Sequence, residues 1–214
     1  MESTHSQAFQ DVFVYTMTKH KKNGTFLEIG ANHPIVINNT YTLETKYNWR
    51  GIMIEYDEQF RSLYTDLRPL STFLIQDATQ INYVNLLEQG NYPKEMDYLQ
   101  IDLEVENRST LNTLELLDQT VFDQYKFATV TFEHDIYRGD FFDTRKISRE
   151  IFQKRGYILM FPNVGIWQGT LTIFEDWYVH PDLVDASLIE ELITTDSLSC
   201  NEIKNRLIRS NHIL

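Results

Sequence analysis

The sequence predicts an α/β protein built on one seven-stranded sheet, in which five parallel strands precede a C-terminal antiparallel hairpin and helices cover both faces. Short runs rich in β-branched and aromatic residues alternate with stretches compatible with helices, which is typical of βα units. The early runs are apolar at nearly every position, as expected of strands buried on both faces. The last two runs lie too close together for a crossover helix between them.

The expected strands cover residues 25–29, 51–55, 72–76, 97–101, 127–133, 157–161 and 170–178. Only residues 162–169 separate the last two, so these strands should pair as a hairpin. Two amphipathic helices are expected near residues 183–194 and 199–209. Five parallel strands followed by a hairpin are typical of the Rossmann-like class I methyltransferase fold, whereas a doubly wound dehydrogenase would continue with βα units.

The chain of 214 residues has the length of a single domain. We expect an N-terminal helix region at 1–23, a Rossmann-like core at 24–180 and a helical extension at 181–214. No apolar run approaches the ~20 residues that span a bilayer, and residues 1–13 lack the pattern of a signal peptide. We therefore expect a cytoplasmic protein, with its oligomeric state open. The single cysteine, Cys200, cannot form an intramolecular disulfide, in agreement with a reducing compartment.

The net charge of −12 disfavours nucleic-acid partners, because their binding depends on cationic side chains that contact phosphates. The one basic strip, residues 19–22, is interpreted as the solvated end of a helix. A small molecule or a glycan is the expected substrate.

Acids and turn residues follow each of the first five expected strands. In sequence order these are Gly30, Ala31 and Asn32; Glu55; Asp77; Asp102 and Glu104; and Glu133, His134 and Asp135. Ligands of open α/β sheets bind beyond the carboxyl ends of the strands, so we expect a ligand site there. Glu55 suits the hydroxyls of a ribose, and Asp77 suits the amino group of an adenine. The alternative is that these acids cap helices, but capping does not require an acid after every strand.

The loop after the first strand has one glycine, Gly30, and no G-x-G-x-x-G motif. A dinucleotide pyrophosphate would lack its close approach to the backbone, which argues against NAD. The loop suits S-adenosylmethionine, a cofactor without phosphates. Asn32, Asn39 and Thr40 are candidates to hydrogen-bond its amino-acid tail, although residues 38–40 also fit a helix cap.

From about Ser6 to Asp182 the chain resembles the FkbM-type family of S-adenosylmethionine-dependent methyltransferases. The matching segments are residues 6–14 (SQAFQDVFV), 24–31 (GTFLEIGA), 38–44 (NNTYTLE), 49–55 (WRGIMIE), 97–105 (DYLQIDLEV), 130–134 (VTFEH) and 175–179 (EDWYV). Two positions depart from the family pattern. Val105 replaces a glycine, and His33-Pro34 replaces Asp-Gly in the cofactor loop.

The resemblance implies S-adenosylmethionine as cofactor and a hydroxyl of a sugar as methyl acceptor, in a glycan or a deoxyhexose such as rhamnose. It also implies a cofactor site, whose candidate residues are Gln10, Glu28, Gly30, Ala31, Asn32, Asn39, Thr40, Glu55, Tyr56, Asp77, Ala78 and Asp102. A natural-product hydroxyl or a protein side chain is the alternative acceptor. A non-catalytic cofactor-binding domain is a further alternative, and a nicotinamide-dependent oxidoreductase is the least favoured.

Methylation of a hydroxyl requires that the acceptor proton be removed. His134, Glu104 and Asp102 are the candidate catalytic residues, with His134 and Glu104 as rival bases. Asp102, Glu133 and Asp135 are candidate ligands of Mg²⁺ or another divalent cation that would acidify the hydroxyl. The alternative role of His134 is structural. Tyr137, Arg138 and Trp167 are candidate acceptor contacts, since sugar faces stack on aromatic rings and arginine can neutralise a phosphate.

Overall fold

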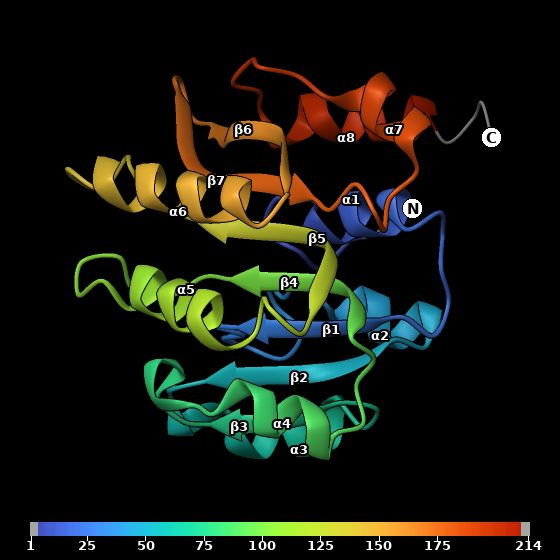
Figure 1. Ribbon diagram of the computed structural model, residues 1–214, viewed down its shortest axis with the longest axis vertical. Coiled ribbons are helices and arrows are strands. Elements are labelled where there is room, and N and C mark those ends of the chain that lie inside the picture. Colours follow the sequence, from blue (N-terminus) through green and yellow to red (C-terminus); the bar gives the residue numbers. More distant parts are fainter. Residues whose placement is uncertain (1–3, 211–214) are drawn as a thin grey trace.

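The computed structural model describes residues 4–210 and contains the predicted seven-stranded sheet. The strands are β1 (Thr25–Ile29), β2 (Arg50–Glu55), β3 (Thr72–Ile75), β4 (Glu95–Ile101), β5 (Lys126–Glu133), β6 (Ile158–Trp167) and β7 (Leu171–Val179). Their order across the sheet is β3-β2-β1-β4-β5-β7-β6. β1 to β5 pair in parallel, and β7 runs antiparallel to both β5 and β6. Figure 1 shows the arrowheads of β1, β2, β4 and β5 pointing the same way.

Helices cover both faces of the sheet (Figure 1). They are α1 (Gln10–Met17), α2 (Tyr41–Tyr47), α3 (Arg61–Leu67), α4 (Tyr83–Gln89), α5 (Ser109–Thr120), α6 (Phe142–Lys154), α7 (Ala186–Leu192) and α8 (Cys200–Ser210), with short 3-10 helices η1 (Glu58–Phe60) and η2 (Ala78–Gln80). Buried residues of α1, α2, α3, α7 and α8 form the core on one face, and those of α4, α5 and α6 form the core on the other. Within residues 4–210, no helix has the length and apolarity to cross a membrane.

The β6–β7 hairpin differs from the prediction. β6 does not end before Pro162 but continues to Trp167, so residues 168–170 form the turn. Proline lacks a backbone N–H and is tolerated in an edge strand, where no ladder hydrogen bond is lost on the open side. The register between β6 and β7 shifts at several points, between Leu159 and Gly165, which absorbs the irregularity.

The outer edge of β6 is covered by the segment that precedes α8. The backbone N–H of Gly165 donates to the carbonyl of Leu198 at 3.1 Å, and Gly165 forms an isolated bridge with Ser199. Asn163 Nδ2 also donates to Ser197 Oγ at 3.0 Å. The segment 197–199 therefore satisfies backbone groups that an uncovered edge strand would expose.

The basic strip at residues 19–22 does more than end a helix. α1 ends at Met17, and Lys19 then forms an ion pair with Asp185 while Lys21 pairs with Asp97 at 2.7 Å. These pairs connect the N-terminal region to the start of β4 and to the loop before α7.

Candidate functional site

The strand order reverses between β1 and β4, and ligands of open α/β sheets bind at such a point. A cavity of about 330 Å³ lies there, at the carboxyl ends of the strands. Its lining consists of Gly30, Asn32, Glu55, Tyr56, Asp57, Asp102, Leu103, Glu104, Glu133, Asp135 and Arg138. An adjoining cavity of about 320 Å³ shares Tyr56, Leu103 and Glu104 and adds Asp77, Ala78, Asn107 and Ser109. We call the two together the edge cavity; it joins residues from β1 to β5 that the sequence singled out.

Gly30 permits β1 and β4 to approach each other at the edge cavity. Its φ of +83° lies in the left-handed region, and its N–H donates to the carbonyl of Ile54 at 2.9 Å. A Cβ at this position would lie 1.6 Å from the carbonyl oxygen of Asp102. Only glycine fits, because both the conformation and the space exclude a side chain.

The carboxylate of Glu55 is held in place by three backbone N–H groups. Oε2 accepts from Asn32 at 2.6 Å, and Oε1 accepts from Tyr56 at 2.7 Å and Asp57 at 2.9 Å. A carboxylate offers about four acceptor positions, so the group remains able to accept a further donor. Asn32 itself has a φ of 50°, which turns the loop towards Glu55.

Asp77 caps a short helix and also lies at the edge cavity. Its Oδ1 accepts from the N–H of Thr79 at 2.9 Å and from the Thr79 hydroxyl at 2.7 Å, so it caps η2. Asp77 also lines the edge cavity beside Ala78. Capping therefore orients the residue without removing it from the cavity.

Glu28 lies behind the cavity in a buried network that shapes the loop after β1. Thr40 Oγ1 donates to Glu28 Oε2 at 2.7 Å and Asn38 Nδ2 does so at 3.2 Å. Burial raises the pKa of Glu28 to about 7, against the opposing charge of Arg68. Asn39, a candidate cofactor contact from the sequence, is buried, and its side-chain Oδ1 has no hydrogen-bond partner within residues 4–210.

Arg68 completes this network, and sequence reasoning missed it. The side chain is fully buried, and its Nε donates to Glu44 Oε2 at 2.9 Å. Its two terminal nitrogens donate to Asn38 Oδ1 at 2.9 Å and to Thr40 Oγ1 at 2.7 Å. No local pattern distinguishes Arg68 from a surface arginine at the end of α3, because its partners are more than 20 positions away in the chain.

Three carboxyl groups meet on the β4–β5 side of the cavity. Glu133 lies close enough to Asp102 and Asp135 for the three groups to interact electrostatically. Burial raises the pKa of Asp102 to about 6, while burial and the nearby Asp102 hold the pKa of Glu133 well above its usual range. Asp102 and Glu133 therefore titrate as a coupled pair. Asp135 Oδ2 accepts from Arg138 Nη1 at 3.1 Å.

The expected metal ligands Asp102, Glu133 and Asp135 do come together. However, no group of three or more histidine, cysteine, aspartate or glutamate side chains in residues 4–210 has an arrangement that could hold a metal ion. The geometry thus gives no support to the expected divalent cation.

His134 does not line the edge cavity. Its ring is fully buried, and Nε2 lies 3.6 Å from Asp176 Oδ1 on the neighbouring strand β7. Asp176 is bound by Arg149, whose Nε and Nη2 donate at 2.7 and 2.9 Å. Side chains alternate along a strand, so His134 faces away from its neighbours Glu133 and Asp135. This position fits the structural alternative, and we do not carry His134 forward as the base.

Gln10 also lies away from the cavity lining. Its Nε2 donates to the buried Glu175 at 2.8 Å, and Glu175 pairs across the strands with Glu133. Burial holds the pKa of Glu175 well above its usual range. Gln10 thus anchors α1 beneath the carboxyl cluster rather than contacting a ligand in the cavity.

The candidate acceptor residues differ in position. Arg138 lines the cavity and is bound by carboxylates on both sides, at 2.8 Å from Glu106 and 3.1 Å from Asp135. Tyr137 is 55% exposed beside this cluster. Trp167 is 67% exposed at the end of β6, outside the cavity.

Two positions depart from the pattern of the FkbM-type family that the sequence resembles. Val105 is buried, and its backbone conformation is ordinary. His33 Nδ1 accepts hydrogen bonds from the backbone N–H groups of Ile35 and Val36, both at 3.1 Å.

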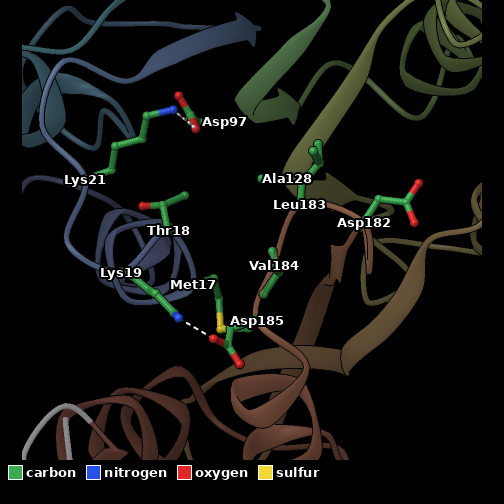
Figure 2. Close-up of a pocket in the computed structure, with 10 residues that line it drawn as sticks. All are labelled: Met17, Thr18, Lys19, Lys21, Asp97, Ala128, Asp182, Leu183, Val184 and Asp185. Carbon is green, nitrogen blue, oxygen red and sulfur yellow. Dashed lines mark hydrogen bonds and ion pairs between the residues drawn. The ribbon is translucent and has the colours of Figure 1, made fainter.

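A separate cavity of about 360 Å³ lies at the opposite end of the sheet, beside the starts of β4 and β5. Figure 2 shows Lys19 and Lys21 pointing towards Asp185 and Asp97. Because its lysines are already paired with carboxylates of the protein, we assign no chemistry to this cavity.

The comparisons with solved structures bear on the fold. A proposed rRNA-methylase from Clostridium thermocellum superposes with a TM-score of 0.52 at 13% identity, covering 84% of this chain and 99% of that one. The chain has the class I methyltransferase fold. A TehB-like SAM-dependent methyltransferase from Corynebacterium glutamicum gives 0.50 at 11% identity, covering 80% and 86%. A precorrin-6y C5,15-methyltransferase from Geobacter metallireducens gives 0.50 at 15% identity, covering 79% and 85%. No protein-family model matches the sequence, and no curated protein matches it significantly.

Proposed function

We propose that this protein is an S-adenosylmethionine-dependent methyltransferase that methylates a hydroxyl group, with a sugar as the acceptor. The edge cavity at the strand-order reversal carries this proposal, because Gly30, Glu55 and Asp77 line it from three successive strands of a methyltransferase fold. The structural neighbours named as methyltransferases agree with it, although such low identities establish a shared fold and not a shared activity.

The residues present fit the cofactor by the chemistry of their donors and acceptors. Glu55 has a carboxylate pre-oriented by three N–H groups, which suits the hydroxyls of a ribose. Asp77 and Ala78 follow β3, one strand further out. The Asp77 carboxylate suits the amino group of an adenine as a hydrogen-bond acceptor, and Ala78 suits its apolar face. Acidic side chains at the β4–β5 side suit a sulfonium cation. S-adenosylmethionine, when bound, supplies an electrophilic methyl group.

The chain's own residues must then orient the acceptor and take its proton. We assign the base to Asp102, which lines the cavity next to Gly30, and whose pKa of about 6 leaves it mostly ionised at neutral pH. Glu133 lies beside Asp102, and burial together with the nearby Asp102 raises its pKa, which favours a protonated Glu133 next to an ionised Asp102. Glu104 is two-thirds exposed at the rim and lies 3.7 Å from Arg138, so it is a weaker candidate.

The sugar acceptor comes from the FkbM-type resemblance and from the exposed aromatic rings of Tyr137 and Trp167 near the carboxyl edge of the sheet. These rings offer flat apolar faces for the C–H face of a sugar. Acceptor screening distinguishes a sugar hydroxyl from the alternative acceptors, a natural-product hydroxyl or a protein side chain. Mass spectrometry would then identify which molecule gains one methyl group.

The cofactor assignment is tested by calorimetry with S-adenosylhomocysteine. Glu55→Ala should weaken binding about tenfold to a hundredfold, because two charge-assisted hydrogen bonds are lost. Glu95→Ala is the matched control, since Glu95 is an exposed acid at the amino end of β4. If S-adenosylhomocysteine does not bind the wild-type protein, or binds Glu55→Ala equally well, the proposed cofactor site is wrong.

A further inference from the structure

The edge cavity has an excess of negative charge. Of the described residues that line its part of about 330 Å³, six are acidic and one, Arg138, is basic. Arg138 does not restore neutrality, because its guanidinium is shared among Glu106, Asp135 and Glu104, at 2.8, 3.1 and 3.7 Å. The resulting field attracts a cationic ligand and disfavours an anionic one.

Asp135 adds a specific hydrogen-bond acceptor to this excess of charge. The residue is only 3% exposed and lines the cavity. Its Oδ2 accepts from Arg138 Nη1 at 3.1 Å, whereas its Oδ1 has no hydrogen-bond partner within residues 4–210. Glu133 lies nearby, but a carboxyl group carries at most one proton and cannot donate to both Asp102 and Asp135. A buried carboxylate oxygen without a donor costs free energy, which a donor on a bound ligand would recover.

The backbone fixes the position of Asp135 at the end of β5. Its N–H donates to the carbonyl of Phe174 at 2.9 Å, and its own carbonyl accepts from the N–H of Arg138 at 2.9 Å. Its φ of 48° lies in the left-handed region, which turns the chain out of the strand. The carboxylate is therefore held in place before a ligand arrives, which lowers the entropic cost of binding.

Asp135 and the assigned base Asp102 lie within reach of one small ligand. Both line the same part of the cavity. Burial raises the pKa of Asp102 to about 6, and the negative charge of Asp135 adds to this rise, so the two carboxyl groups interact. A single sugar can therefore present a hydroxyl to Asp102 and a second donor to Asp135.

We propose that Asp135 binds a protonated amino group of the methyl acceptor, so that the acceptor is an amino sugar whose reacting hydroxyl lies at Asp102. An ammonium group suits this position because it donates hydrogen bonds and also supplies the positive charge that a neutral hydroxyl lacks. An ammonium held by a carboxylate keeps its proton and has no free lone pair, so the methyl group goes to the hydroxyl. This inference rests on the proposed function, since Asp135 contacts an acceptor only if the cavity transfers a methyl group.

Nuclear magnetic resonance titrations with D-glucosamine, N-acetyl-D-glucosamine and D-glucose test the proposal. The three probes share a pyranose ring, and only glucosamine carries a positive charge. Wild-type protein should bind glucosamine about tenfold more tightly than either neutral probe. The preference should disappear when the pH is raised above the pKa of the glucosamine amine. If glucosamine does not bind, or binds no more tightly than glucose, the proposal is overturned.

Two variants locate the preference. Asp135→Asn keeps the size of the side chain but removes its charge, and should bind glucosamine no more tightly than N-acetylglucosamine. Asp143→Asn removes the same charge from an exposed position in the first turn of α6 and should keep the preference of the wild type. An unchanged preference in Asp135→Asn, or an equal loss in Asp143→Asn, would show that Asp135 is not the binding residue.

The two proposals fail separately. Binding of S-adenosylhomocysteine reports on the cofactor site and should be retained in Asp135→Asn, which also shows that the variant is folded. Equal binding of all three sugars with cofactor binding intact would refute the amino-sugar proposal and leave the methyltransferase proposal standing. Preferential binding of glucosamine without cofactor binding would refute the methyltransferase proposal.

Discussion

Replacement of Gly30 by alanine tests whether the junction of β1 and β4 builds the cofactor site. The φ of +83° costs an L-residue about 1–2 kcal/mol. The new Cβ would also lie 1.6 Å from the Asp102 carbonyl oxygen. A normal carbon–oxygen contact is ~3.3 Å, so the ends of β1 and β4 must separate by roughly 1.5–2 Å. We expect the free energy of unfolding to fall by about 2–4 kcal/mol.

The same displacement moves Asp102, the assigned base, relative to Glu55. A misplacement of ~1 Å in a reacting group can reduce turnover about a hundredfold. Gly30→Ala should therefore lose both S-adenosylhomocysteine affinity, measured by calorimetry, and methyl transfer, measured with labelled cofactor. Urea unfolding, followed by circular dichroism, gives the stability.

Gly169 in the β6–β7 turn is a matched control. Its φ is also +83°, but no atom lies within 4 Å of an added Cβ. Gly169→Ala should destabilise the fold by only about 1 kcal/mol, the cost of the backbone conformation alone, and should bind the cofactor normally. The reasoning is refuted if Gly30→Ala binds S-adenosylhomocysteine as tightly as the wild type, or if Gly169→Ala loses the same affinity.

Three other predictions concern buried charges. Turnover should rise with pH through about 6, because a base acts only when ionised and the pKa of Asp102 is about 6. Asp102→Asn should abolish this rise. An unchanged pH–rate profile in this variant would exclude Asp102 as the base. Arg68→Met should reduce the free energy of unfolding by about 3–5 kcal/mol in urea titrations, since it leaves the buried Glu44 without its cationic partner. A loss below ~1 kcal/mol would contradict this. The pKa of Glu28 is raised to about 7, so the stability that its protonated form contributes is complete below pH ~4 and is lost as the pH rises through 7. Glu28→Gln should therefore make the decline of the free energy of unfolding between about pH 5 and 8 shallower than in the wild type. An equal decline in the variant and the wild type would contradict the raised pKa of Glu28.

The sheet could be predicted from the sequence because its signals are local. The apolar runs of β1 and β2, such as TFLEI and RGIMIE, are short, continuous and separated by helical stretches. The end of β6 was less predictable, because Pro162 normally terminates a strand and only the edge position tolerates it. Which strand lies at the edge is a property of the whole sheet and not of the local sequence.

Some residues of the candidate site could be predicted from local sequence, and others could not. Glu55 and Asp102 follow directly from strands, so their position at the carboxyl edge was predictable. His134 also follows a strand, but a one-residue difference in alternation turns its ring into the core towards Asp176. Arg68 had no local signal at all, since its role depends on partners brought together by the fold.

The covered edge of β6 also has a consequence for the order of folding. Ser199, which bridges to Gly165, is synthesised 20 residues after β7 ends at Val179, a delay of roughly 1–4 s at ~5–20 residues per second. During that interval the nascent chain has the complete sheet but an unpaired outer strand, which can pair with another chain. This interval is when aggregation and chaperone binding compete with folding, and substitutions within residues 197–199 should reduce the yield of folded protein more than its final stability.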